Sequence, residues 1–510
     1  MVKRIVCSLI LGSVLVASAA WAEGPVLTIA NGPGFGGAQG TFVQRELEKM
    51  TGVKLNLIAL GGWGDYSTKL NLLMSQKDTM PDIIWRSGMD TEFQQWVDNG
   101  QLVDMLPLLK KYGKDILGYY GKDVLWYAVE NGKLFKLPGD VAESCDRTLL
   151  VRKDWLDALG MKPPRTLDEY KKMLEAFTTK DPDKDGKADT YGSAVYKDSG
   201  SWLGDLSFSV FCQAYGVPMG EAWVIQDDGT LKLNTVMPGM KQALKDYSEC
   251  IAKGWIDKST ASKEMEEVIA SGSIGAYYGF IDDLNPSSSR YQAFKKNNPN
   301  GSWIAVDLPK GPDGFSSDNP ESPNGWCFVS ITNHAKDPAM AMKVLDCFAS
   351  PAGYKLRKFG VEGKNYKIQN GSLIDITPAS DRPKLGIDQI LWFVDRKDAN
   401  NLKNTSATTA VFKKRAISSE PLRKKMFWFK TSNRPVYNKT MPDLNMLRDQ
   451  VFAQIALGQA NISVFDKFVS DWYARGGSDV EKEANAVYTQ EKADYGAWSK
   501  YYAENLKPSD

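Results

Sequence analysis

The regular alternation of short apolar strands with helices near the start of the chain is the feature that most constrains its fold. Strand-like segments cover 26–30, 54–58 and 82–85, and helical segments over 42–50 and 67–75 separate them. Strands that are joined through helices lie parallel, with each helix crossing over one face of the sheet. A second block of strands and helices follows, and the C-terminal part is mainly helical. The sequence therefore predicts an α/β fold with mainly parallel sheets flanked by helices.

The length of the chain predicts two lobes. A chain of 510 residues is too long for a single hydrophobic core. We expect residues 1–22 to be a signal peptide, lobe one to comprise 23–145 plus about 306–375, and lobe two to comprise 146–305 plus about 376–510. A chain that passes between two lobes through short connections can hinge there.

The N-terminal segment has the features of an export signal. Lys3 and Arg4 form a basic end, residues 5–20 form an apolar run, and a small-x-small cleavage site ends at Ala22. The apolar run is too short for a comfortable membrane span. Cys7 precedes the cleavage site, so the lipoprotein arrangement, with a cysteine directly after that site, is missing. We expect cleavage after Ala22 and export to a Gram-negative periplasm.

Composition and residue counts disfavour several classes of protein. The chain has 63 Lys and Arg residues against 62 Asp and Glu, and without a basic stripe it is not expected to bind nucleic acid or a membrane surface. The single histidine, His334, nearly removes Ser-His-Asp, Cys-His and His-ligated metal chemistry. The six cysteines, one of them in the signal segment, have no close spacing, which argues against a disulfide framework or a zinc site.

An acidic loop predicts a calcium site. Carboxylates stand at positions 1, 3, 5 and 9 of a nine-residue loop, as Asp181, Asp183, Asp185 and Asp189. Gly186 at position 6 permits the sharp turn, and Lys187 at position 7 contributes only its backbone carbonyl, as in the start of an EF-hand loop. Gly192 stands where the closing Glu is expected, so the site is static rather than a sensor. The plainer alternative is a solvated acidic turn.

Six short motifs, in order along the chain, support a family resemblance. They are residues 80–83 (MPDI), 99–104 (NGQLVD), 131–138 (NGKLFKLP), 151–160 (VRKDWLDALG), 360–366 (GVEGKNY) and 465–469 (FDKFV). The chain resembles the extracellular solute-binding proteins of ABC sugar importers. More narrowly, it is similar to the oligosaccharide-binding group that includes the periplasmic alginate-oligosaccharide-binding proteins. The resemblance covers nearly the whole mature chain.

The resemblance implies a fold and a function. The fold is a two-lobed Venus flytrap of the periplasmic-binding-protein type, with an oligosaccharide ligand trapped between the lobes. The function is delivery of that ligand to the transmembrane permease subunits of an ABC importer, by a monomeric protein and without catalysis. Related alginate binders carry a carboxylate directly after the last Asp of the calcium loop. Here Thr190 takes that place, so Ca²⁺ should bind more weakly or use water or a neighbouring group.

Sugar sites combine aromatic platforms with planar polar side chains, and in open α/β lobes ligands lie beyond the carboxyl ends of the strands. These rules select candidate ligand contacts near strand ends and glycine-rich turns. They are Trp63, Trp85, Arg86, Asp90, Glu143, Arg147, Trp202, Tyr277, Tyr278, Asp282, Trp326 and Trp392. Arg86, Arg147 and Arg152 favour an acidic sugar, either uronate-containing or sulfated, because guanidinium groups match carboxylates and sulfates.

Two other classes of protein remain open. The first is a secreted, calcium-stabilised enzyme that degrades glycans with two carboxylates, which the many Asp and Glu residues permit. The second is a calcium-stabilised adhesin or surface scaffold, which the lack of repeats and anchoring signals disfavours. Turnover of a labelled oligosaccharide would indicate the enzyme, and tight binding without turnover would indicate the importer subunit.

Overall fold

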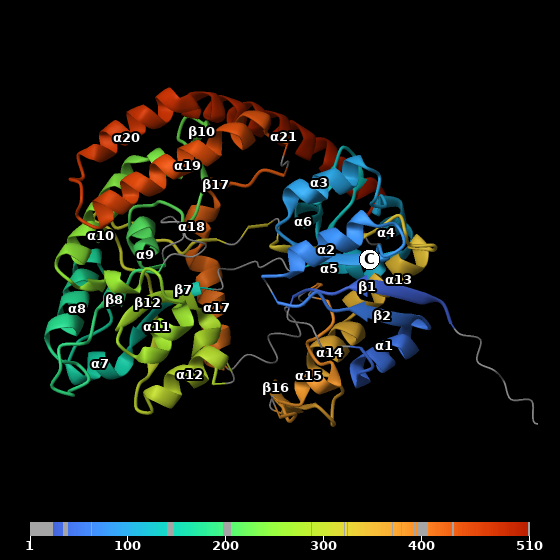
Figure 1. Ribbon diagram of the computed structural model, residues 1–510, viewed down its shortest axis with the longest axis horizontal. Helices are drawn as coiled ribbons and strands as arrows, with labels where there is room; N and C mark the ends of the chain where they lie inside the picture. The colour runs from blue at the N-terminus through green and yellow to red at the C-terminus, as the bar shows by residue number, and fades with distance from the viewer. Residues whose placement is uncertain are drawn as a thin grey trace, which may run out of the picture.

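The computed structural model of the protein describes most of the chain. The described ranges are 24–33, 39–62, 64–139, 147–196, 206–286, 288–320, 322–323, 325–369, 371–378, 380–391, 393–394, 406–430 and 433–507. Two lobes lie side by side, with helices covering their sheets, as Figure 1 shows. The two-lobed α/β fold predicted from the sequence is therefore confirmed.

The first lobe is built on a five-stranded sheet with the strand order β2-β1-β3-β14-β6. β1 (Val26–Ala30) pairs in parallel with β2 (Lys54–Ile58) and β3 (Ile83–Ser87), as the alternation of strands and helices predicted. β14 (Cys327–Ile331) runs antiparallel to β3 and to β6 (Leu137–Pro138). The return of β14 into this sheet ties a late segment of the chain to the first lobe.

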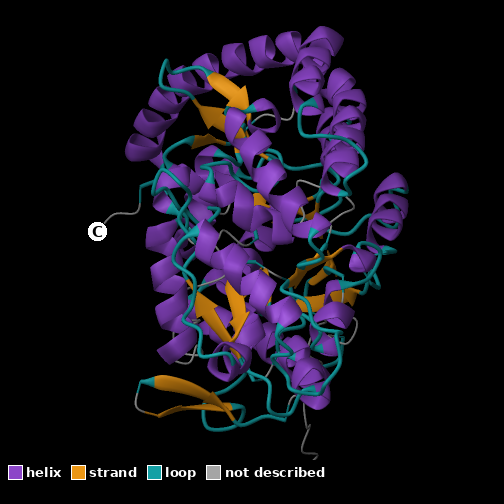
Figure 2. Ribbon diagram, turned by 90° about the vertical axis from the view of Figure 1, so that its left-hand side faces the viewer, coloured by secondary structure: helices purple, strands orange, loops and turns teal. Residues whose placement is uncertain are grey.

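Local signals set the ends of the first crossover helix, α1 (Phe42–Thr51). The Thr41 hydroxyl accepts a hydrogen bond from the Gln44 N–H, and Gly52 ends the helix in the left-handed conformation with φ 69°. The other helices of the lobe are α2 (Tyr66–Ser75), α3 (Asp90–Asp98), α4 (Leu106–Tyr112), α5 (Lys114–Tyr119), α6 (Lys122–Trp126), α13 (Pro338–Ala349), α14 (Pro351–Phe359) and α15 (Arg382–Leu385). Two hairpins complete it, β4 (Val129–Glu130) with β5 (Lys133–Leu134), and β15 (Tyr366–Gln369) with β16 (Ser372–Asp375). The second of these projects from the bottom of the view in Figure 2.

The second lobe has an antiparallel central sheet. β7 (Arg147–Arg152) lies between β12 (Ala276–Phe280) and β13 (Trp303–Val306), and both neighbours run against it. This differs from the mainly parallel sheets that we expected. The long segment between β7 and β12 contains several helices and small sheets, so no single crossover helix fixes a parallel direction for the returning strand.

Smaller sheets and many helices surround β7. The strands are β8 (Ser193–Ala194) parallel to β11 (Ile256–Asp257), and the antiparallel set β9 (Trp223–Ile225), β10 (Leu231–Leu233) and β17 (Met426–Phe427). The helices are α7 (Lys153–Ala158), α8 (Leu167–Thr179), α9 (Leu206–Ala214), α10 (Pro238–Ala252), α11 (Met265–Ser271), α12 (Ser289–Asn297), α17 (Ser406–Ser418), α18 (Glu420–Arg423), α19 (Pro435–Ala456), α20 (Val464–Trp472) and α21 (Ser478–Asn505). Short helical turns cover Asn234–Val236, Lys258–Thr260, Ile281–Leu284 and Tyr473–Gly477.

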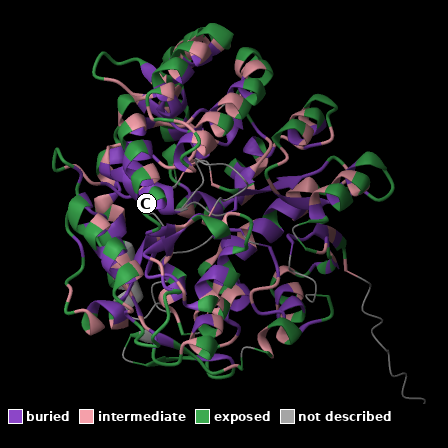
Figure 3. Ribbon diagram, turned by 60° about the vertical axis from the view of Figure 1, so that its left-hand side comes forward, coloured by how far each residue is buried: buried purple, intermediate pink, exposed green. Residues whose placement is uncertain are grey.

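Each lobe has its own large hydrophobic core, and buried residues concentrate inside both (Figure 3). The cores differ from the predicted division at the C-terminal side, where we assigned all of 376–510 to lobe two. Ile387 and Phe393 pack in the first core, and so does Trp498 near the end of the chain. Phe393 is held in the first lobe by Arg357 of α14, which donates to its carbonyl at 2.8 Å. Trp498 reaches the first core because α21, 28 residues long and thus about 42 Å, starts in the second core and arches across to the first (Figure 1).

Among the described residues, no helix combines the length and the apolar character that crossing a bilayer requires. Four cysteines in that part of the chain, Cys212, Cys250, Cys327 and Cys347, are free thiols, and three of them are buried. The predicted signal peptide, residues 1–22, lies outside the described residues.

Candidate functional site

A cleft between the lobes contains the candidate site. Two adjoining hollows of ≈ 380 Å³ and ≈ 1090 Å³ form it, and Asp90, Arg434 and Tyr437 line both. The first lobe contributes α3 and residues near β6 and β14, and the second contributes residues around β9, β17 and the start of α19. The cleft is therefore walled by segments that are far apart in the sequence.

Aromatic side chains from both lobes reach this cleft. Trp326, just before β14, is 41% exposed, and Trp428, just after β17, is half-buried on the opposite wall. Phe427 adds a third ring from the second lobe. Exposed or half-exposed aromatic faces in a polar cleft are what stacking against the apolar face of a sugar requires.

Trp85 is placed behind the cleft rather than in its wall. Its side chain is fully buried between Tyr66 and Trp326, with ring centroids 5.9 Å from each. The predicted ligand contact at Trp85 is therefore not what this structure shows. Consecutive residues of β3 are buried, so both faces of this strand are covered, and Trp85 supports Trp326 from beneath.

Of the two predicted contacts Arg86 and Asp90, only Asp90 lines the cleft. The Arg86 guanidinium is buried between the rings of Phe93 and Phe328, 4.1 and 4.5 Å from their centroids, and does not line the cleft. Its Nη1 donates to the Asp90 carboxylate at 3.1 Å, and Asp90 itself is exposed in the cleft wall. Burial lowers the pKa of Arg86, and the Asp90 charge opposes that shift.

The predicted contacts in the second lobe lie away from the two hollows. Tyr277 and Tyr278 are buried in the second core, and the Tyr277 hydroxyl donates to Asp283 at 3.2 Å. These two expectations are wrong for this structure because both faces of β12 are covered. The Arg147 guanidinium lies over the Phe280 ring at 4.8 Å, and Asp282 is exposed on the turn after β12.

Four of the predicted contacts and one further arginine remain. Trp63, Glu143, Trp202 and Trp392 lie outside the described residues. Arg152, one of the three arginines that favoured an acidic sugar, is buried and engaged with Asp154 at 2.6 Å.

Sequence reasoning missed several residues of the cleft wall. They are Lys136, Glu221, Trp428, Lys430, Arg434 and Tyr437. A usable signal was the dense mixture of aromatic and basic residues over 426–437, since such a run is unusual for a purely structural segment. The sequence did not indicate where this run lies relative to the first lobe.

Charged groups in the cleft are held by defined partners. The Lys136 ammonium lies 3.5 Å from Glu130, and burial lowers the pKa of Lys136. The Tyr437 hydroxyl donates to the Glu221 carboxylate, and burial together with that charge raises the pKa of Tyr437. The cleft thus combines aromatic faces with fixed cations and carboxylates.

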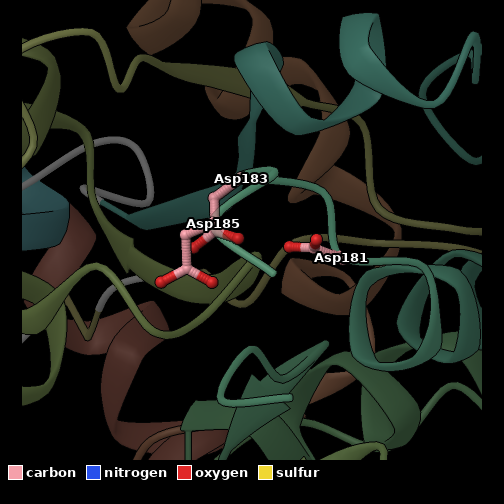
Figure 4. A group of neighbouring side chains, drawn as sticks. All are labelled: Asp181, Asp183 and Asp185. Carbon is pink, nitrogen blue, oxygen red and sulfur yellow. The ribbon is translucent and has the colours of Figure 1, made fainter. Parts of the chain in front are cut away.

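The acidic loop forms a separate site at the end of α8. One carboxylate oxygen from each of Asp181, Asp183 and Asp185 lies within 4.8 Å of the other two. Figure 4 shows these three side chains on the loop. Gly186 turns the chain with φ +80°, and its N–H donates to the Asp181 carboxylate at 3.1 Å. The loop does not line the two hollows of the cleft.

The residues present fit a hard cation. One carboxylate oxygen of Asp181, Oδ1, is shielded from solvent and has no hydrogen-bond partner. Burial and the neighbouring carboxylates of Asp181 and Asp185 raise the pKa of Asp183, and a cation among these groups would favour the charged form. Oxygen donors with this spacing suit Ca²⁺. The Lys187 ammonium pairs with Asp185 at 2.7 Å, and Asp189 is exposed.

The far end of the loop is closed by packing. The Thr190 hydroxyl donates to the Phe177 carbonyl at 2.9 Å, so this hydroxyl faces the helix and not the carboxylates. A Cβ at Gly192 would lie 2.5 Å from the Leu174 Cα, which leaves no space for the Glu that closes a sensor loop. The chain returns against α8 where such a Glu would otherwise stand.

Comparisons with known proteins find a matching family model and several similar proteins. A family model described as "Bacterial extracellular solute-binding protein" matches residues 36–355. Lipoprotein LipO of Bacillus subtilis is 24% identical over 465 residues, covering 88% of this chain and 89% of that protein. The polygalacturonan/rhamnogalacturonan-binding protein YtcQ of B. subtilis is 25% identical over 482 residues, covering 88% of each chain.

Solved structures share the fold at low sequence identity. The alginate-binding protein AlgQ2, solved without calcium ion, superposes with a TM-score of 0.69 at 19% identity, covering 92% of this chain and 98% of AlgQ2. The substrate-binding protein FusA of Streptococcus pneumoniae, in complex with kestose, has a TM-score of 0.71 at 19% identity, covering 92% of this chain and 100% of FusA.

Proposed function

Because the chain belongs to the bacterial extracellular solute-binding proteins, we propose that it is the substrate-binding component of an ABC importer and captures an oligosaccharide between its lobes. The observation that carries the proposal is the pair of tryptophans, Trp326 and Trp428, that line the cleft from opposite lobes. Closure of the lobes would bring both rings against one ligand. The relatives FusA, a fructooligosaccharide-binding protein, and YtcQ support a sugar as that ligand.

The sugar we propose is acidic, with uronate or sulfate groups. The names of YtcQ and AlgQ2 support uronate-containing chains, and the cleft supports an acid through the cations Lys136, Lys430 and Arg434 in its wall. The arginines that suggested this from the sequence do not line the hollows. Arg86 and Arg152 are buried and pair with Asp90 and Asp154, and Arg147 lies over the Phe280 ring.

The protein acts by binding and release in this proposal. It would be exported as a monomer, remain free in the periplasm after cleavage at Ala22, and deliver its ligand to the permease subunits. The alternative, a glycan-degrading enzyme, requires two carboxylates that act on one bond. Asp90 and Glu221 in the cleft are instead engaged, Asp90 by Arg86 and Glu221 by Tyr437.

We also propose that the loop 181–189 holds one structural Ca²⁺. Asp181, Asp183 and Asp185 would supply carboxylate oxygens, and Asp189 and the Lys187 carbonyl are the further ligands expected from the loop positions. Bound there, the ion neutralises the acidic cluster and fixes the segment after α8. Because the loop does not line the hollows of the cleft, we assign the ion a role in stability and not in sugar contact.

One experiment separates the classes of function. Purified protein is titrated with acidic and neutral oligosaccharides in a calorimeter, and each mixture is then analysed for cleavage products. Stoichiometric binding with intact sugar supports the importer subunit. Product formation that is lost in an Asp90→Asn or Glu221→Gln variant would establish the enzyme instead.

A further inference from the structure

The guanidinium of Arg434 lies enclosed in the cleft with part of its hydrogen-bonding capacity unused. It lines both hollows, and its Nε and Nη1 atoms are shielded from solvent without a hydrogen-bond partner. An arginine is always charged and offers five N–H donors. Buried donors of this kind are normally paired, so unpaired ones in a cleft indicate a missing acceptor.

The carboxylates around Arg434 are committed to other groups. Glu221 accepts from the Tyr437 hydroxyl and lies 3.8 Å from the Arg448 guanidinium. Glu130 pairs with Lys136, and Asp90 accepts from Arg86. Glu221, Glu130 and Asp90 are therefore each engaged with a group other than Arg434.

The side chain of Arg434 is also held in place. Its guanidinium lies over the rings of Phe429 and Tyr437, 4.4 and 3.8 Å from their centroids. Arg434 directly precedes α19, whose first N–H groups, those of Val436 and Tyr437, donate to the Glu483 carboxylate of α21 at 2.9 and 2.8 Å. The helix start is thus satisfied by the protein itself, and the arginine is fixed between two rings before any ligand arrives.

Two lysines strengthen the positive charge of the same wall. Lys136 reaches the hollow from the first lobe, and Lys430 reaches it from the second. Each ammonium is partly removed from water, and this burial lowers the pKa of both lysines. An anion between them would recover part of that lost hydration.

We propose that Arg434 is the residue that recognises the negative group, a carboxylate or a sulfate, on one sugar unit of the oligosaccharide. The inference rests on the proposed function and names the group that reads the acidic character of the ligand. A planar guanidinium matches the geometry of a carboxylate or a sulfate. A neutral sugar would leave the enclosed N–H groups without a charged acceptor, and a site with unpaired polar groups rejects such a ligand.

The test compares acidic oligosaccharides with their neutral counterparts. The probes are an alginate trisaccharide and a galacturonate trisaccharide, each with its methyl ester, and a keratan sulfate tetrasaccharide, which contains no uronate, with its neutral desulfated form. We expect the wild-type protein to bind at least one acidic probe about tenfold or more tightly than the neutral counterpart in calorimetry. Loss of affinity on esterification identifies a carboxylate, and loss on desulfation identifies a sulfate.

Variants assign the preference to Arg434. Arg434→Gln should weaken the acidic probe about tenfold or more and leave the neutral one within about twofold, which removes the preference. Arg434→Lys keeps the charge without the planar fork and should lie between wild type and Arg434→Gln. The control is Lys439→Gln, which removes one positive charge from an exposed position of the same helix and should keep the preference. Thermal melting checks that each variant is folded.

Each outcome decides the matter. Equal binding of acidic and neutral probes by the wild type, or equal weakening of both by Arg434→Gln, overturns the inference and leaves the sugar-binding function standing. If Arg434→Gln does not fold, unchanged affinity in Arg434→Lys overturns it, and partial loss of the acidic preference supports it. If no oligosaccharide binds the wild type, the proposed function fails together with the inference.

Discussion

Trp326 rests edge-on against Trp85, with ring centroids 5.9 Å apart and an angle of 74° between the ring planes. The two rings differ in exposure, since Trp85 is fully buried and Trp326 is 41% exposed. This edge-to-face contact indicates different roles for the two neighbouring tryptophans. Trp326 presents a face to the cleft, and Trp85 fixes the position of that face from behind.

The first prediction separates these roles by substitution. Trp326→Ala should weaken oligosaccharide binding by about 1–3 kcal/mol with little effect on thermal stability, because it removes an exposed stacking face. Trp85→Ala should lower the free energy of unfolding by about 3–5 kcal/mol, because it opens a cavity in the core. Calorimetry and denaturant unfolding measure the two effects. The assignment is wrong if Trp326→Ala destabilises the fold as much as Trp85→Ala does.

The second prediction concerns the acidic loop. A calcium chelator should lower the melting temperature, because an ion that binds only the native loop stabilises it by mass action. Affinity for the oligosaccharide should stay within about a factor of three, since the loop does not line the cleft hollows. Asp183→Ala should have the same effect as the chelator.

Asp78→Ala, which removes an exposed carboxylate from a turn in the other lobe, is the matched control and should leave the melting curve and its calcium response unchanged. A melting curve of Asp183→Ala identical to that of the wild type, with and without chelator, would favour an empty acidic turn. Loss of sugar binding on chelation, in protein that stays folded, would place the ion beside the cleft.

Much of the fold could be predicted from local sequence patterns, and the site could be predicted only in part. The two-lobed α/β class and the first three strands of the first sheet are confirmed, because periodicity and strand–helix order are local properties. Asp90 and Trp326 were found because they follow or precede strands that end at the cleft. Trp85 and Tyr278 were misplaced because their strands are covered on both faces, which alternation along one strand does not reveal.

The residues of the opposite wall depend on long-range packing. Trp428 and Arg434 meet Asp90 across the cleft although more than 300 residues separate them from it in the sequence. The path of α21 is a similar case, since its last turns join the first core after a long passage through the second lobe. Local sequence propensity does not indicate which distant segments of the chain pack together. These contacts are seen only in the three-dimensional structure.

The third prediction concerns α21 as the connection between the two cores. Trp498 is buried in the first core, and its Nε1 donates to the Lys122 carbonyl at 2.8 Å. Trp498→Ala should lower the free energy of unfolding by about 3–5 kcal/mol through the cavity it leaves. Tyr501→Ala, which changes an exposed ring one turn away, should cost far less. Denaturant unfolding compares the two variants, and equal small losses would mean that the end of α21 does not contribute to the first core.

The fourth prediction is a pH dependence centred on Asp346 in α13. Burial raises the pKa of Asp346 to about 6, while the Ile116 N–H, which donates to its Oδ1 at 2.9 Å, opposes the shift. Because the folded-state pKa lies above the ordinary value, the protonated form is the one that suits the fold. The contribution of the Asp346 carboxyl group to folding stability is fully present below the ordinary pKa of an aspartate. It is lost as pH rises through about 6.

Asp346→Asn should therefore raise the melting temperature relative to wild type at about pH 7.5 and change it little at about pH 4.5. The amide keeps an oxygen acceptor for the Ile116 N–H but carries no charge to desolvate. Asp337→Asn is the control, since that residue caps the same helix through the Met340 N–H at an exposed position. Melting curves across this pH range decide the matter. A stabilisation by Asp346→Asn that is equal at both pH values, or a loss at pH 7.5, would show that the Asp346 carboxylate is ionised in the fold without cost.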